Sequence, residues 1–205
     1  MSNVTKTGLS AALVCVLFLL QAAAALADGD PAVGEELAFT CMGCHGIEGY
    51  RNAYPSYRVP KLGGQRAGYI DAALKDYRDG ARPHPTMQAQ GSSLSDQDIA
   101  DIAAWFEGEQ SVEVTISGDE SDYPEVGQTC LACHGANGAA VQPTPPVLSG
   151  QYLSYLERAL KQYRGAARGG NVMNAFAGNL SDDDIDALAQ FYSQRSGLET
   201  PEKSR

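Results

Sequence analysis

An internal repeat constrains the fold of this chain more than any other feature of its sequence. Residues 60–106 align with residues 146–192 at a constant offset of 86, with identities at about 20 of 47 positions. Three paired runs carry most of the match: Pro60–Gln65 with Pro146–Gln151, Ala73–Arg78 with Ala159–Arg164, and Leu94–Ile99 with Leu180–Ile185. One long repeat of this kind indicates two copies of a domain of about 80 residues, not a solenoid of many short units.

Each copy is predicted to be mostly helical. In the first copy one apolar face at i, i+3, i+4, i+7 spacing predicts a helix over Tyr69–Arg78, formed by Ile70, Ala73, Leu74 and Tyr77. Ser95 followed by Asp98 predicts the capped start of a last helix, and Ser181 with Asp184 predicts its equivalent in the second copy. The sequence therefore favours an all-α fold.

The segment between the copies is predicted to be an acidic linker. Residues 107–125 contain seven acidic residues and no Lys or Arg, with Gly108, Gly118 and Pro124 as helix breakers. The only convincing strand pattern in the chain, Val112–Ile116, also lies there. We expect a first domain over residues 28–110, a linker over residues 111–122 and a second domain over residues 123–205.

The first 27 residues resemble a secretory signal peptide. A single Lys6 precedes an apolar run from Leu9 to Leu20, and Ala25-Leu26-Ala27 is a small-x-small cleavage pattern. An uncleaved membrane anchor is the alternative, because the apolar stretch nearly reaches the roughly 20 residues that span a bilayer. We favour cleavage and a periplasmic location.

Charge limits the possible partners. Removal of residues 1–27 takes away one Lys and no acid, so the net charge of −10 becomes −11. Such a surface does not bind nucleic acid, which needs an excess of Lys and Arg. It favours protein partners that carry a basic docking patch.

Two matched motifs of the form Cys-x-x-Cys-His indicate covalent haem attachment. Cys41, Cys44 and His45 match Cys130, Cys133 and His134 at an offset of 89. Two thiols at i and i+3 lie on one side of a helical turn and can add to the two vinyl groups of one haem, while the adjacent imidazole reaches the iron. A thioredoxin-like pair would need a βαβ context, a shared zinc site would need closer spacing, and disulfides would leave both histidines unexplained. We expect two covalently bound haem c groups, each with its iron.

The duplication also nominates the second axial ligand of each iron. Met87 and Met173 are related by the offset of 86, and each is expected in a loop before the last helix. Met42 lies inside the first attachment motif and cannot reach the opposite face of the haem. His84 is the remaining competitor, but its counterpart is Gly170, so we favour Met87. His/Met ligation raises the reduction potential and leaves no open site for oxygen or peroxide, so we expect electron transfer and no catalysis.

Along the whole mature chain these motifs resemble the dihaem cytochrome c4 family. The resemblance implies two tandem class I cytochrome c domains that pack about a pseudo-twofold axis with their haem propionate edges facing each other. Pro60 and Pro146 match the position whose carbonyl accepts a hydrogen bond from the ligand imidazole. Trp105 and Phe191 match the aromatic residue that packs on the first helix, and Gly34 matches the close-crossing position on that helix.

Two departures from the family pattern stand out. The segment before Cys130 is short and contains Pro124, so the first helix of the second copy is expected to be abbreviated. The first copy also carries three extra residues in an insert, Tyr50–Arg58, which is richer in aromatic and basic residues than residues 136–145. The insert is either a surface loop that covers a haem edge or a docking or propionate-binding element.

The resemblance implies a monomeric respiratory electron carrier, loosely associated with the membrane, between a quinol-oxidising complex as donor and a terminal oxidase as acceptor. A cytochrome subunit that accepts electrons from a periplasmic dehydrogenase is the alternative. A dihaem peroxidase is less favoured, because it needs one haem with an open or displaceable ligand.

Overall fold

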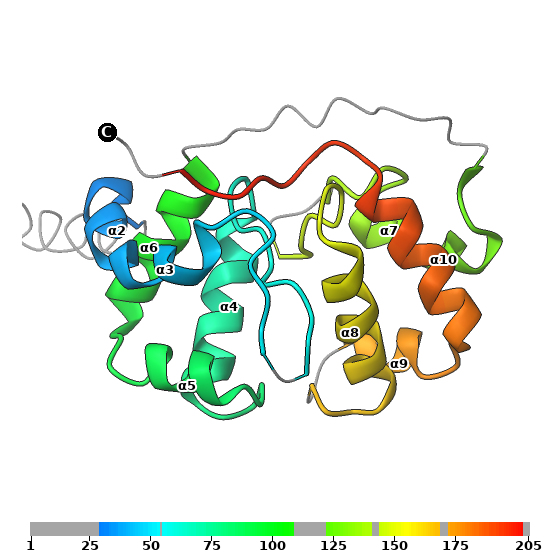
Figure 1. Ribbon diagram of the computed structural model, residues 1–205, viewed down its shortest axis with the longest axis horizontal. Helices are drawn as coiled ribbons and strands as arrows, with labels where there is room; N and C mark the ends of the chain where they lie inside the picture. The colour runs from blue at the N-terminus through cyan, green and yellow to red at the C-terminus, as the bar shows by residue number, and fades with distance from the viewer. Residues whose placement is uncertain (1–28, 54, 109–121, 141–143, 169–171, 203–205) are drawn as a thin grey trace, which may run out of the picture.

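The computed structural model describes residues 29–53, 55–108, 122–140, 144–168 and 172–202, which form two helical halves side by side (Figure 1). The first half contains α2 (Pro31–Leu37), the 3-10 turn η1 (Ala38–Thr40), α3 (Met42–His45), α4 (Ala67–Arg78), α5 (Pro85–Gly91) and α6 (Asp96–Gly108). The second contains the 3-10 turn η3 (Glu125–Cys130), α7 (Leu131–His134), α8 (Leu153–Arg164), α9 (Val172–Ala177) and α10 (Asp182–Ser193). From the attachment motif onward the helices recur in the same order, α3 to α6 and α7 to α10, as the duplication predicts.

The expected signal segment, the strand pattern Val112–Ile116 and most of the linker lie outside the described residues. Within the described ranges, no helix combines the length and the apolar character needed to cross a membrane.

The last helix of each half begins at its predicted cap. Ser95 Oγ accepts from the Asp98 N–H (3.1 Å), while an Asp98 carboxylate oxygen accepts from the Ser95 N–H (2.8 Å). Ser181 and Asp184 repeat both bonds at 3.1 and 2.9 Å. These reciprocal bonds satisfy N–H groups that a helix start leaves without partners.

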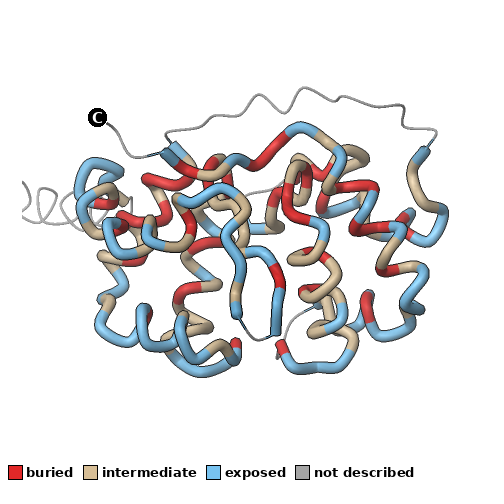
Figure 2. Tube along the Cα trace, viewed as in Figure 1, coloured by how far each residue is buried: buried red, intermediate tan, exposed pale blue. Residues whose placement is uncertain are grey.

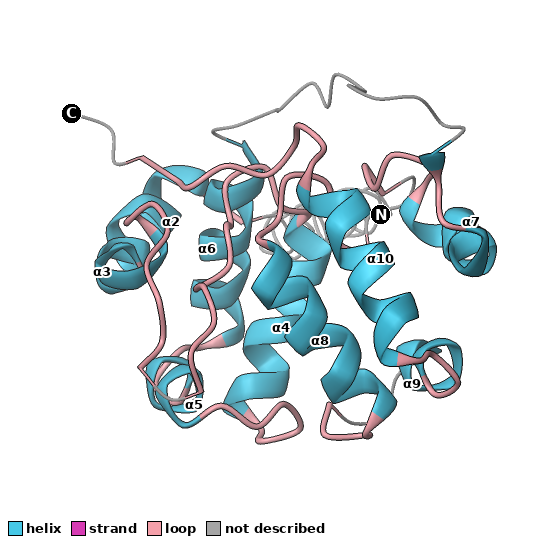
Figure 3. Ribbon diagram, turned by 45° about the vertical axis from the view of Figure 1, so that its right-hand side comes forward, coloured by secondary structure: helices cyan, strands magenta, loops and turns pink. Residues whose placement is uncertain are grey.

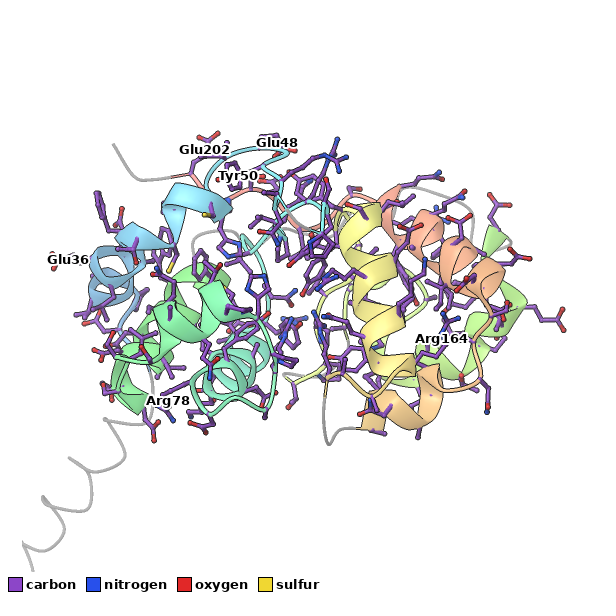
Figure 4. The ribbon with its side chains drawn as sticks, turned by 60° about the horizontal axis from the view of Figure 1, so that its bottom comes forward. Glu36, Glu48, Tyr50, Arg78, Arg164 and Glu202 are labelled. Atoms are coloured by element: carbon purple, nitrogen blue, oxygen red, sulfur yellow. The ribbon has the colours of Figure 1, made fainter. Side chains whose placement is uncertain are left out.

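Matching arginines tie the end of one helix to the start of the next in each half. The guanidinium of Arg78, at the end of α4, donates to the Leu94 carbonyl and pairs with Asp96 at 2.8 Å. Arg164, at the end of α8, repeats this arrangement with the Leu180 carbonyl and Asp182. Figure 4 labels both arginines. The equal geometry shows that the duplication extends to side-chain contacts.

In the first half, α2 crosses α6 at Gly34. A Cβ at this glycine would lie 2.0 Å from the Asp101 carbonyl oxygen, so no side chain fits there. The Asp30 N–H also donates to an Asp101 carboxylate oxygen at 2.7 Å. Trp105 is buried on α6 and belongs to the core cluster of this half. Figure 2 shows the buried positions of the chain in red. The close crossing and the aromatic packing are as the family resemblance implied.

In the second half, the first helix is replaced by the 3-10 turn η3, as Pro124 predicted. The ring of Tyr123 packs edge-on against Phe191 with centroids 4.9 Å apart, and its hydroxyl lies 2.8 Å from that of Tyr192. Tyr123 and η3 therefore cover α10 where α2 covers α6 in the first half.

The end of the chain returns from the second half to the first. Residues 198–200, here called the C-terminal strap, follow α10 and run back over the first half (Figure 1). Glu199 forms a two-way backbone bridge with Gly63 at 3.0 and 3.1 Å, and the Leu198 N–H donates to the Ser149 carbonyl at 2.8 Å. The Thr200 hydroxyl donates to Glu48. The strap thus contacts both halves.

The insert of the first half also reaches the second half. The Arg58 N–H donates to Ser154 Oγ on α8 (3.1 Å), and the guanidinium carbon of Arg158 lies 4.5 Å from the centre of the buried Tyr57 ring. In Figures 1 and 3, α4 and α8 lie in the middle of the molecule, with α6 and α10 farther out. The insert is therefore part of the contact between halves.

Candidate haem sites

Each Cys-x-x-Cys-His motif folds as a single helical turn. In the first half the N–H groups of Cys44 and His45 donate to the Cys41 carbonyl at 3.1 and 2.9 Å. In the second half, α7 follows directly from Cys130 and ends at His134. Burial raises the pKa of the Cys41 and Cys130 thiols above the ordinary value.

The histidine of each motif is buried and oriented by a proline carbonyl. His45 Nδ1 lies 2.8 Å from the Pro60 oxygen, and His134 Nδ1 lies 3.0 Å from the Pro146 oxygen. Because a carbonyl only accepts, Nδ1 carries the proton and Nε2 keeps its lone pair for a metal. Burial lowers the pKa of both histidines, and the carbonyl bond offsets part of that effect. Both rings are thus neutral and ready to bind iron.

The structure corrects the expectation that each methionine lies in a loop. Met87 lies in α5, a short helix between α4 and α6, and Met173 lies in α9, a short helix between α8 and α10. In the first half His84 caps α5, with its Nδ1 accepting from the Met87 N–H at 3.3 Å, and Pro85 follows at the first helical position. Pro is favoured there because its fixed φ suits a helix start.

His84, the competing candidate, has protein partners at both ring nitrogens. Nδ1 accepts from the Met87 N–H, so Nε2 carries the proton and donates to the Tyr57 hydroxyl at 2.7 Å. The ring is also in edge contact with Tyr57 and Tyr77. These contacts place His84 beside the methionine and favour a role in holding α5 over a role as ligand.

In the second half the candidate ligands line common cavities. A cavity of about 100 Å³ is bordered by Cys130, His134 and Met173 together with apolar side chains of α8 and α10. An adjoining cavity of about 270 Å³ shares those three residues. The apolar lining and the candidate ligands suit a large apolar cofactor. In the first half, Cys41 and Met87 pack against one core cluster.

A buried cationic cluster borders these cavities. Arg82 and Arg168, related by the offset of 86, are only 7% and 5% exposed. Both line the second-half cavity with Tyr69, and the Nε atom of Arg82 has no hydrogen-bond partner among the described residues. Buried guanidinium groups need an anion. The two carboxylates of a haem supply that chemistry, so the cavity, its candidate ligands and its cations fit the group.

Sequence reasoning did not single out this cluster, although the repeat contained the signal. Arg82 and Arg168 are identical at aligned positions, as are Tyr69 and Tyr155.

Comparisons with known proteins place both halves among the c-type cytochromes. Residues 31–108 match the family model described as cytochrome c, and residues 124–191 match the model described as cytochrome c oxidase, cbb3-type, subunit III. The chain is 36% identical to cytochrome c4 of Thiocapsa roseopersicina, over 82% of this chain and 94% of that protein. It is 31% identical to a thiosulfate dehydrogenase electron acceptor of Stutzerimonas stutzeri, over 80% of this chain and 82% of that protein. The crystal structure of reduced recombinant cytochrome c4 from Pseudomonas stutzeri superposes with a TM-score of 0.65 at 29% identity, covering 83% of this chain and all of that one.

Fold and site together define a c-type cytochrome with two tandem domains, each carrying one covalently bound haem. At the level of family, the chain belongs to the cytochrome c4 proteins. It is therefore a dihaem electron carrier whose partners are redox proteins.

Proposed function

We propose that this chain carries electrons in the periplasm from a quinol-oxidising complex toward a terminal oxidase. The observation that carries the proposal is the position of Pro60. Its carbonyl orients His45 of the first half, yet the same residue lines the cavity that contains His134 and Met173 of the second half. The ligand loop of one site thus borders the other site, which suits passage of electrons through the protein.

The proposed ligand sets are His45 with Met87 and His134 with Met173, within domains over residues 28–110 and 123–205. The haem supplies a one-electron iron couple, and the protein sets its potential through the ligands and their hydrogen bonds. Pro60 and Pro146 hold the two imidazoles in one orientation and tautomer. Arg82 and Arg168 hold positive charge beside the cavity, where haem carboxylates would otherwise be buried without a counter-ion.

A spectroelectrochemical titration of the wild type and of Met87→Ala and Met173→Ala tests this function. The wild type should show two reducible haems, both with the weak red absorption band of a thioether bound to ferric iron. Each variant should lose half of that band and should lower the potential of one haem. A band that survives in both variants contradicts the ligand assignment.

The proposed direction of electron flow requires a separate experiment. Purified reduced protein should be oxidised rapidly by a haem–copper oxidase, and the oxidised protein should be reduced rapidly by a quinol-oxidising complex. Both rates should fall as salt rises, because an acidic surface with a net charge of −11 after cleavage meets basic patches. If both electron-transfer rates are no higher than those measured with an unrelated c-type cytochrome, the proposed direction is contradicted.

The periplasmic location follows from cleavage after Ala27. Protein from a periplasmic extract should begin at Asp28. An intact Met1 in a membrane fraction would show that the apolar segment stays as an anchor.

A second candidate function is favoured by one comparison. The 31% identical protein of Stutzerimonas stutzeri is named an electron acceptor of thiosulfate dehydrogenase. If this chain has that role, a thiosulfate dehydrogenase with thiosulfate should reduce it faster than the quinol-oxidising complex does. The comparison of the two reduction rates decides between the candidates.

A further inference from the structure

Two glutamines of the repeat exchange partners across the contact between the halves. Gln65 of the first half donates from Nε2 to the Val147 carbonyl (3.1 Å) and accepts at Oε1 from the Val147 N–H (2.8 Å). Gln151 of the second half does the same with Lys61, both bonds being 3.0 Å. Each side-chain amide therefore pairs with both backbone groups of one residue in the other half.

The paired residue follows directly after the proline that orients an axial histidine. Val147 follows Pro146, whose carbonyl accepts from His134 Nδ1 at 3.0 Å. Lys61 follows Pro60, whose carbonyl accepts from His45 Nδ1 at 2.8 Å. Gln65 thus fixes the backbone that holds the histidine of the second half, and Gln151 fixes the backbone that holds the histidine of the first.

Both glutamine side chains are restrained by burial and by hydrogen bonds. Both side chains are buried, each with 3% exposure. Each Oε1 also accepts a second backbone N–H, from Arg66 for Gln65 and from Tyr152 for Gln151, at the start of α4 and of α8. A buried amide that lost these bonds would leave several polar groups without partners, which is costly. The amide therefore holds the proline segment and the helix start in one arrangement.

We propose that Gln65 and Gln151 are positioning residues that set the potential of the haem in the opposite half. The inference rests on the proposed ligand roles of His45 and His134. A firm hydrogen bond from Nδ1 to a carbonyl makes the imidazole a stronger donor to iron, which favours the ferric state. Loosening the carbonyl weakens this donation, so the potential of that haem rises.

The test measures both haem potentials in Gln65→Leu and in Gln151→Leu, each the matched control of the other. Gln65→Leu should raise the potential of the second haem, and Gln151→Leu that of the first. A threefold change in the equilibrium for reduction, about 30 mV for one electron, is the expected size. The haems are assigned with Met87→Ala and Met173→Ala, which remove the red band of one haem each.

The crossed pattern separates this inference from a general loss of structure. Shifts in the haem of the same half, equal shifts in both haems or unchanged potentials would overturn it. If a Leu variant loses haem, Gln65→Asn and Gln151→Asn, which keep the amide but shorten it by one methylene, replace it. A wrong ligand assignment would be detected separately, because the red absorption band would then persist in both Met87→Ala and Met173→Ala.

Discussion

The guanidinium of Arg82 donates from Nη2 to the hydroxyl of Tyr155 across the contact between the halves, over 2.9 Å. The same hydroxyl receives a longer bond of 3.4 Å from Arg168. Burial raises the pKa of Tyr155, but the positive charges of Arg168 and Arg82, together with hydrogen bonds from Arg168 and Tyr69, outweigh burial and lower the pKa to about 7. One phenol thus lies between two buried cations, one from each half.

Replacing that phenol should weaken the protein. Tyr155→Phe removes an acceptor from two guanidinium groups, and the free energy of unfolding should fall by about 2 kcal/mol, as for other hydrogen bonds to charged groups. Denaturant unfolding of the haem-loaded protein measures it. Tyr163→Phe is the control, because it keeps the ring whose centre lies 5.1 Å from Arg168 Cζ. Equal losses in the two variants would contradict the role of the Tyr155 hydroxyl.

The helices that carry Met87 and Met173, α5 and α9, are held by different contacts, and this difference is testable. In the first half the Tyr57 hydroxyl and His84 hold α5, while in the second the Asn174 amide donates to the carbonyls of Tyr163 and Arg168 at 2.8 and 2.9 Å. Tyr57→Phe should speed binding of added imidazole to the ferric first haem about three- to tenfold, the effect of one lost hydrogen bond.

Asn174→Ala is the mirrored variant and should speed imidazole binding at the second haem only. Stopped-flow absorbance resolves the two phases. If Tyr57→Phe accelerates the phase that Asn174→Ala accelerates, the two helices are not held independently.

The crossing of α2 over α6 predicts a strong effect at Gly34. Gly34→Ala places a methyl group 2.0 Å from the Asp101 carbonyl oxygen, and separating the helices should cost about 3 kcal/mol of unfolding free energy. Gly108→Ala, at the end of α6, adds a methyl group with no heavy atom within 4 Å among the described residues and should change stability by less than about 0.5 kcal/mol. Thermal unfolding of both variants measures these changes, and a Gly34→Ala loss as small as that of Gly108→Ala would contradict the close crossing.

The cap of α6 predicts a stability difference that depends on pH. The side chain and the N–H of Ser95 both donate to Asp98, which lowers the pKa of that carboxyl below its usual 3.8. A lowered carboxyl pKa means that the unfolded state binds the proton more tightly. This contribution is therefore present above pH 3.8 and disappears as the pH falls through the folded pKa.

Ser95→Ala should therefore lower the unfolding free energy by about 1 kcal/mol at pH 7, with a smaller difference below pH 3.8. Urea titrations at several pH values measure it. Ser92→Ala removes a hydroxyl that donates to the Ala89 carbonyl, and its effect should not vary with pH in this range. A Ser95→Ala difference that is constant with pH would show that Asp98 does not depend on Ser95.

The sequence predicted the helical halves from their apolar periodicity, the caps at Ser95 and Ser181 from the Ser-x-x-Asp pattern, and the close crossing at Gly34 from the family resemblance. It did not predict that Met87 lies in a helix, since the short pattern Pro85–Gly91 has too few residues for an amphipathic period. The pairing of Gln65 with Val147 could not be predicted either. Such contacts depend on how the two folded domains pack together, and no local sequence pattern indicates that packing.

The C-terminal strap has a consequence for the order in which the protein matures. Thr200 and Glu48 are bonded although they lie 152 residues apart in the chain. Contacts of such separation form late, because the intervening chain must be ordered first. The contacts of the strap with Gly63 and Glu48 therefore form only after the second half has folded against the first. A variant truncated before Leu198 would keep both Cys-x-x-Cys-His motifs but would lose this late link between the halves.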